Sequence, residues 1–368
     1  MKEKTIFIFD AEEGMTLSKD VFLPDGPILA TKGTVLDLGL ISRISTSQIL
    51  EVSVYDKPTE TTAKNSTSTG DPFFEDQTYY EKIRNSKEFE HFNKRYLSNI
   101  SDIKDQLNDI VTSNIPINTT ELLQGTSQIL VEYKNSLQLF DMLHCMRQFD
   151  DLTYVHCVNV ALISSIIGKW MHFSEEDITT LTLAGLLHDI GKLLTPEEIL
   201  TKPGKLTSDE YNIMKNHVNL GYEQLKEQDL DIRIKEACLL HHENCDGSGY
   251  PFHLTGNKIP PVAKIISIAD VYDAMTAARV YRGSICPFRV IDVMSADAYT
   301  KFDPSYLLPF LNNVVTSYIH NNVKLSNDQV GKVILINNRT PSRPIIQCSA
   351  TNFIDLSKER QLEITAIL

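Results

Sequence analysis

Two short segments of this chain place metal-ligand side chains next to each other. His188 is followed directly by Asp189, and His241 is followed directly by His242. Both pairs lie in apolar stretches of sequence, where buried polar groups need partners. Imidazole and carboxylate groups suit iron, manganese, zinc, nickel or cobalt, and two such ions held together activate water against a phosphate ester. The pattern therefore indicates a hydrolytic centre with two metal ions.

More residues of the same chemical type lie within the same half of the chain. The candidate set consists of His156, His188, Asp189, His217, His241, His242 and Asp270. Taken singly, His156 and His217 are better explained as hydrogen-bonded core histidines. Asp270 could equally well be a ligand or a cap or buried ion-pair partner. The carboxylate of Asp189 could bridge two ions. The cluster is therefore a stronger indication than any of its members.

The composition of the 368-residue chain limits its class. Hydrophobic residues make up 42% and charged residues 23%, which is ordinary for a globular protein. No run of about 18 apolar residues is present, so neither a membrane span nor a signal peptide is expected, and a cytoplasmic location follows. The net charge of −13 argues against broad binding to DNA or RNA. The six cysteines form no CxxC pair that would indicate structural zinc.

The periodicity of the sequence divides the chain into five parts. Residues 1–55 are interpreted as a small β-rich regulatory module, and the Ser/Thr-rich residues 56–75 as a polar linker. Helical spacing covers a connector at 76–136 and the domain with the candidate ligands at 137–323. Strand patterns return in a C-terminal β segment at 324–368, where residues 330–336, 344–348 and 362–364 are expected to form strands. The expected fold is therefore mainly α, a helical bundle with β-rich ends.

Local signals indicate where some helices begin. Thr207, with Glu210 three residues later, is a capping signal, and Asp303 before Pro304 is an N-cap followed by proline in the first turn. Residues 101–151 are expected to form a helix. Its apolar positions could serve a partner helix in a homodimer or packing within its own domain, so the oligomeric state does not follow.

Five segments resemble motifs of the HD-GYP family of cyclic di-GMP phosphodiesterases within the HD superfamily, and they occur in the same order as in that family. They are Leu187–Lys192, Lys202–Thr207, Met214–His217, His241–Pro251 and Ile268–Thr276. The likeness extends over roughly half of the chain, from about residue 137 to 320. It implies an HD-type helical bundle that hydrolyses cyclic di-GMP to pGpG, GMP or both.

The resemblance also implies a ligand set and an attacking group. One ion would be bound by His156, His188 and Asp270. The other would be bound by His217, His241 and His242, and Asp189 would bridge the two ions. Iron or manganese is the expected metal, with zinc, nickel and cobalt as further candidates. A hydroxide bridging the two ions would attack the phosphorus.

Four side chains would contact the substrate by the same resemblance. Lys192 would stabilise the developing charge on the scissile phosphate, Arg279 and Arg282 would bind the phosphates, and Tyr250 would line the nucleotide pocket. Without the resemblance, Lys192 would be an ordinary cation at a helix C-terminus, the arginines surface charges and Tyr250 part of a turn.

The sequence departs from the family pattern at two places and leaves other functions open. Leu152 stands where some members carry a glutamate that helps to hold a third metal, so a two-metal site is expected. Residues 193–198 change the loop after Lys192 without removing a ligand. One alternative is a non-catalytic sensor of cyclic dinucleotides. Another is a phosphodiesterase for a different cyclic dinucleotide, such as cyclic GMP-AMP.

Overall fold

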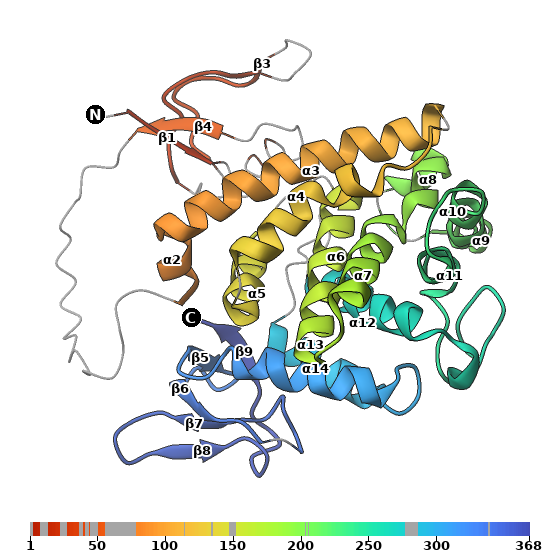
Figure 1. The fold of residues 1–368 in the computed structure, drawn as a ribbon. Helices are drawn as coiled ribbons and strands as arrows, with labels where there is room; N and C mark the ends of the chain where they lie inside the picture. The colour runs from red at the N-terminus through yellow and green to blue at the C-terminus, as the bar shows by residue number, and fades with distance from the viewer. Residues whose placement is uncertain are drawn as a thin grey trace. The chain divides into compact units, whose positions relative to one another are not determined.

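The computed structural model divides the chain into two compact units, residues 1–71 and 72–368, and each is described by itself (Figure 1). The residues that the structure describes are 3–7, 14–22, 28–36, 40, 44, 51–55, 79–113, 115–133, 135–146, 152–202, 204, 206–276, 286–337 and 339–368. The expected linker at 56–75 lies outside them. Among the described residues, no helix is long and apolar enough to cross a membrane.

The N-terminal unit contains two short antiparallel strand pairs. β1 (Glu3–Phe7) pairs with β4 (Glu51–Tyr55), and β2 (Val21–Phe22) pairs with β3 (Ile28–Ala30). Its core consists of buried Leu17, Val21, Ala30, Leu36, Ile44, Val52 and Val54. The β-rich character expected for this part of the chain is present in these strands.

The larger unit is mainly helical, and the mainly α fold expected from the periodicity is confirmed. Two 3₁₀ turns, η2 (Ile190–Leu194) and η3 (Gly256–Lys258), interrupt the α-helices. The described α-helices are α2 (Tyr79–Arg84), α3 (Lys87–Ser113), α4 (Thr119–Glu132), α5 (Ser136–Cys145), α6 (Leu152–Trp170), α7 (Glu175–Leu187), α8 (Glu197–Leu200), α9 (Ser208–Lys215), α10 (His217–Leu225), α11 (Ile232–Leu240), α12 (Pro261–Thr276), α13 (Pro287–Ala296) and α14 (Pro304–Thr316).

The expectation of one helix across residues 101–151 is wrong. The side chain of Asn118 accepts a hydrogen bond from the first turn of α4, and the side chain of Asn135 does the same for α5. Each asparagine therefore caps a new helix. Pro116 cannot donate a backbone hydrogen bond and follows the end of α3. The segment is therefore divided among α3, α4 and α5.

Both predicted helix starts further along the chain are confirmed. Thr207 and Glu210 form a reciprocal capping box at the start of α9. The side chain of Asp303 accepts a hydrogen bond from the backbone N–H of Ser305, and Pro304 occupies the first turn of α14. These signals are purely local, which is why they could be recognised without knowledge of the packing.

The C-terminal segment forms a five-stranded antiparallel sheet in the order β8-β7-β6-β5-β9. Two of its strands, β6 (Val330–Leu335) and β7 (Ile345–Gln347), coincide with predicted strand patterns. The third predicted strand, at 362–364, shares only Ile364 with β9 (Ile364–Ile367). The other two, β5 (Asn322–Leu325) and β8 (Phe353–Asp355), are only four and three residues long. Neither was predicted: β5 alternates between partly buried and buried residues, but it spans the boundary expected between residues 323 and 324.

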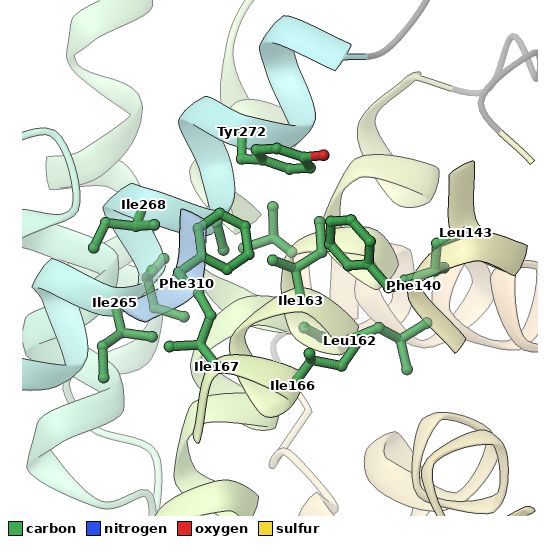
Figure 2. Close-up of a cluster of buried hydrophobic side chains, with 14 of the residues drawn as sticks. Phe140, Leu143, Leu162, Ile163, Ile166, Ile167, Ile265, Ile268, Tyr272 and Phe310 are labelled. Carbon is green, nitrogen blue, oxygen red and sulfur yellow. The ribbon is translucent and has the colours of Figure 1, made fainter. Parts of the chain in front are cut away.

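The core of the larger unit fixes α6 and α12, two of the helices that carry candidate ligands (Figure 2). Tyr272 of α12 contacts Phe140 of α5 and Phe310 of α14, with ring centroids 5.5 and 5.1 Å apart. Ile163 and Ile166 of α6 are completely buried in the same cluster. Displacing α6 against α12 would break this packing, so the positions of the ligands on both helices are determined by the core.

Helices α6 and α7 approach each other closely at Gly185. A Cβ atom at this position would lie 2.4 Å from Ala161 Cα and 2.6 Å from Ala161 N. We therefore expect Gly185→Ala to lower the free energy of unfolding by about 1–3 kcal/mol, although alanine favours helices. Chemical denaturation measures the change.

Gly168→Ala is a suitable comparison, because a Cβ there would meet side-chain atoms of Leu181 and Ile178, at 2.9 and 3.3 Å, instead of backbone. Side-chain atoms can move aside, so this variant should lose less stability. A Gly185→Ala protein as stable as the wild type would show that the helices can separate without cost.

Candidate metal centre

The predicted ligands lie mainly at helix ends, and the structure brings them together. His188 and His241 are the C-caps of α7 and α11, and Asp189 and His242 follow them directly. His217 is the first residue of α10. The two remaining ligands, on α6 and α12, are His156 and Asp270. Five different helices therefore contribute to one cluster.

The ligand atoms form two neighbouring groups. Within each group, one potential ligand atom from every residue lies within 4.8 Å of the others. The groups are Asp189, His217, His241 and His242, and His156, His188 and Asp270.

Asp189 belongs to the first group and also lies close to histidines of the second. Its Oδ1 is 3.2 Å from Nε2 of His217 and 3.7 Å from Nε2 of His241. Its Oδ2 is 3.2 Å from Nε2 of His188 and 3.6 Å from Nε2 of His156. One carboxylate oxygen thus faces each group, as a bridging ligand requires.

Three of the histidines are held in one tautomer by their own helices. Nδ1 of His188, His217 and His241 lies 2.8, 2.7 and 3.0 Å from the main-chain carbonyl oxygen of the residue three positions earlier. A carbonyl oxygen only accepts, so each Nδ1 carries the proton and donates it. The lone pair of each Nε2 is consequently available at the centre, an arrangement typical of metal-binding histidines.

Several buried polar atoms of this cluster make no hydrogen bond among the described residues. They are Nε2 of His188, His217 and His241, and Oδ1 of Asp189. Leaving four buried polar atoms unpaired is costly, and divalent cations held by the two groups would satisfy all of them. The donor set of imidazole nitrogens and carboxylate oxygens fits first-row transition metals.

Burial and neighbouring charges set the protonation of the site. Burial lowers the pKa of His242 well below its ordinary value and also lowers the pKa of His241, which favours the neutral form that binds metal. Burial alone would lower the pKa of His156 as well. Its hydrogen bonds to Asp270 and Asp273 outweigh burial and raise that pKa to about 10. A cation between His156 and Asp270 would take the place of this proton.

Lys192 on η2 lies at the edge of the cluster, where its Nζ donates a hydrogen bond to Oδ2 of Asp189. Burial would lower the pKa of Lys192, but the carboxylates of Asp189 and Asp270 outweigh it and raise that pKa. In turn, His188 and Lys192 overcome the effect of burial and hold the pKa of Asp189 well below its usual range. The lysine therefore stays charged beside the carboxylate whose two oxygens face the two groups of histidines.

Tyr250 covers one side of the centre. Its ring stacks on the imidazole of His242 with centroids 4.8 Å apart and planes 25° apart. The carboxylate of Glu243 accepts hydrogen bonds from the backbone N–H groups of Phe252 and Leu254, at 2.6 and 2.9 Å. The loop that carries Tyr250 is thereby tied to the residue that follows the two histidines.

Two of the predicted phosphate contacts, Arg279 and Arg282, lie outside the described residues. Their roles stay predictions. A different cation, Lys215, lies near the described site: its Nζ is 5.9 Å from the centroid of Tyr250 and 5.2 Å from that of Tyr211.

The sequence interpretation missed two residues that support a predicted ligand, His156. Asp273 Oδ2 accepts a hydrogen bond of 2.8 Å from Nδ1 of His156, and Asp273 Oδ1 accepts one of 3.0 Å from the amide of Asn159. Asp273 stands three residues after Asp270, and Asn159 three residues after His156. Residues at this spacing share a helix face, and that signal could have identified both.

Fold and site together define a helical domain with a paired His/Asp cluster suited to divalent metal. A sequence model of the family described as HD domain matches residues 123–306, half of the chain. The chain belongs to the HD domain family.

Curated relatives share this part of the chain. The cyclic di-GMP phosphodiesterase response regulator RpfG of Xanthomonas campestris is 40% identical over 39% of this chain and 38% of its own length. The cyclic di-GMP phosphodiesterase PA4108 of Pseudomonas aeruginosa is 31% identical over 62% of this chain and 54% of its own length. The 3′3′-cGAMP-specific phosphodiesterase 1 of Vibrio cholerae is 42% identical over 39% of this chain and 33% of its own length. The chain spans about half, or less, of the length of these relatives. The resemblance to the HD-GYP family is confirmed.

Proposed function

We propose that this protein is a metal-dependent phosphodiesterase that hydrolyses cyclic di-GMP to pGpG, GMP or both. The observation that carries the proposal is the position of Asp189, whose two carboxylate oxygens face separate groups of histidines. The unpaired Nε2 atoms around it support a metal-binding role. The names of two relatives, both cyclic di-GMP phosphodiesterases, support the substrate.

The ligands would hold two divalent ions, with iron or manganese expected before zinc, nickel or cobalt. His156, His188 and Asp270 would bind one ion, and His217, His241 and His242 would bind the other. Asp189 would be a ligand to both ions. When bound, a pair of such ions lowers the pKa of water and neutralises the oxygens of a phosphate ester.

The protein's own side chains would provide the remaining functions. Lys192, held charged beside Asp189, would donate a hydrogen bond to a non-bridging phosphoryl oxygen as its negative charge grows. The stacked ring of Tyr250 would present an aromatic face to a nucleobase. Arg279 and Arg282 would bind the phosphates of the substrate.

A phosphodiesterase for cyclic GMP-AMP is the second candidate. It is favoured by the relative of that specificity in Vibrio cholerae, which is 42% identical over the shared region. The sensor function is less well supported, since the complete set of seven candidate ligands is present in the cluster.

The experiment that tests the proposal is incubation of the metal-loaded protein with each cyclic dinucleotide separately, followed by chromatography of the products. We expect cyclic di-GMP to give pGpG or GMP at the higher kcat/KM. Faster hydrolysis of cyclic GMP-AMP would favour the second candidate. Binding of both nucleotides without cleavage would contradict the phosphodiesterase and indicate a sensor.

A further inference from the structure

A continuous chain of hydrogen bonds joins helix α3 to the ligand His156. The hydroxyl of Tyr96 donates to Oδ1 of Asn159 at 2.5 Å, and Nδ2 of Asn159 donates to Oδ1 of Asp273 at 3.0 Å. Oδ2 of Asp273 then accepts from Nδ1 of His156 at 2.8 Å. Three helices, α3, α6 and α12, are thus linked to one imidazole.

The chemistry of the chain allows only one orientation of its members. The carboxylate of Asp273 only accepts, so the amide of Asn159 must turn its NH₂ group towards Asp273 and its oxygen towards Tyr96. For the same reason, Nδ1 of His156 carries its proton on the Asp273 side. Its Nε2 is then left facing Asp270, 3.0 Å away.

The hydroxyl of Tyr96 is not needed to fill space. Tyr96 is fully buried on the apolar face of α3, where its ring stacks on Phe92 with centroids 5.5 Å apart. Phenylalanine would keep this packing. It would leave Oδ1 of Asn159 without the hydrogen bond from the tyrosine in a buried setting, where Asn159 is 5% exposed, and this costs free energy or makes the amide reorient.

Helix α3 lies outside the part of the chain that the HD domain model matches, residues 123–306. The described ligands and their nearest supports all lie within that part. Tyr96 therefore extends the support of the centre into the connector helix.

We propose that Tyr96 is a positioning residue for the metal centre. By holding the amide of Asn159, it keeps Asp273 and the imidazole of His156 in the orientation that presents Nε2 to an ion. The inference rests on the metal-binding part of the proposed function and is independent of which substrate is cleaved.

The test is the binding of Mn²⁺ to the 368-residue chain carrying Tyr96→Phe, measured through the EPR signal of the free ion. Removing a hydrogen-bond partner of a ligand typically weakens metal binding by about 10–100-fold. Because Tyr96 is linked to His156 only through Asn159 and Asp273, we expect an effect near the lower end of this range. The ion at His156 should bind roughly tenfold more weakly, and the other ion should bind as in the wild type. Adding Tyr96→Phe to Asp273→Asn should weaken binding little further, since the chain is already broken.

Tyr154→Phe is a matched control. The hydroxyl of Tyr154 on α6 donates to Oδ1 of Asn108 on α3 at 2.9 Å, so this variant also removes a tyrosine–asparagine hydrogen bond between the same two helices. We expect it to lower stability and leave Mn²⁺ affinity unchanged. If Tyr96→Phe only lowers stability, as Tyr154→Phe does, and binds Mn²⁺ like the wild type, the inference is overturned. Mn²⁺ binding without hydrolysis of any cyclic dinucleotide would overturn the proposed phosphodiesterase alone.

Discussion

Asp189→Ala is expected to lower turnover of cyclic di-GMP at least a thousand-fold, which corresponds to about 4 kcal/mol in the activation barrier. Asp189 is the residue whose two carboxylate oxygens face both histidine groups, at 3.2 Å from His188 and from His217. Its replacement removes a ligand from each group and the partner of Lys192. Steady-state kinetics, together with elemental analysis of the purified variant, measures both losses.

Asp303→Ala is the control for loss of a carboxylate elsewhere in the domain. Asp303 caps α14 and pairs with Lys264 at 2.8 Å. Losing the cap should cost about 1 kcal/mol of stability and leave metal content and turnover intact. An Asp189→Ala protein with near-normal turnover and metal content would remove Asp189 from its proposed role.

Lys192→Ala is expected to lower kcat by roughly 100–1,000-fold, the usual cost of losing one donor to a developing negative charge. Its Nζ contacts Asp189 without belonging to either ligand group, so most of the metal should be retained. The measurement is the separate determination of kcat and KM at full metal occupancy.

Lys226→Ala serves as the comparison, because this lysine pairs with Glu223 on the exposed surface. Its kinetics should match the wild type. If Lys192→Ala raised KM and left kcat unchanged, Lys192 would contribute to substrate binding alone and not to stabilising the transition state.

The fold class could be predicted because it depends on patterns that repeat along the chain. Helical spacing and the local capping signals at Thr207 and Asp303 each require only a few neighbouring residues. The breaks before α4 and α5 carry local signals of the same kind, at Asn118 and Asn135, but the interpretation of this segment used apolar spacing alone. Strands β5 and β8 of the C-terminal sheet were missed, and β5 spans the boundary expected between residues 323 and 324.

The candidate ligands could be selected from the sequence, but their geometry could not. Adjacent pairs such as His188 and Asp189 can be recognised because both side chains are common metal ligands. Which oxygen of Asp189 faces which histidine depends on how α7, α10 and α11 pack, and no spacing contains that information. Tyr96 was not recognisable at all, since it is separated from Asn159 by 63 residues and resembles any other aromatic residue of an apolar helix face.

The most direct test of the proposed function is turnover of cyclic di-GMP as a function of metal content. Protein purified without oxygen would be depleted with a chelator and reloaded stepwise with Fe²⁺ or Mn²⁺, with product formation and ions per chain measured on the same samples. We expect no hydrolysis by the depleted protein and full activity at about two ions per chain. Undiminished hydrolysis by metal-free protein, or two bound ions with no product, would contradict a metal-dependent phosphodiesterase.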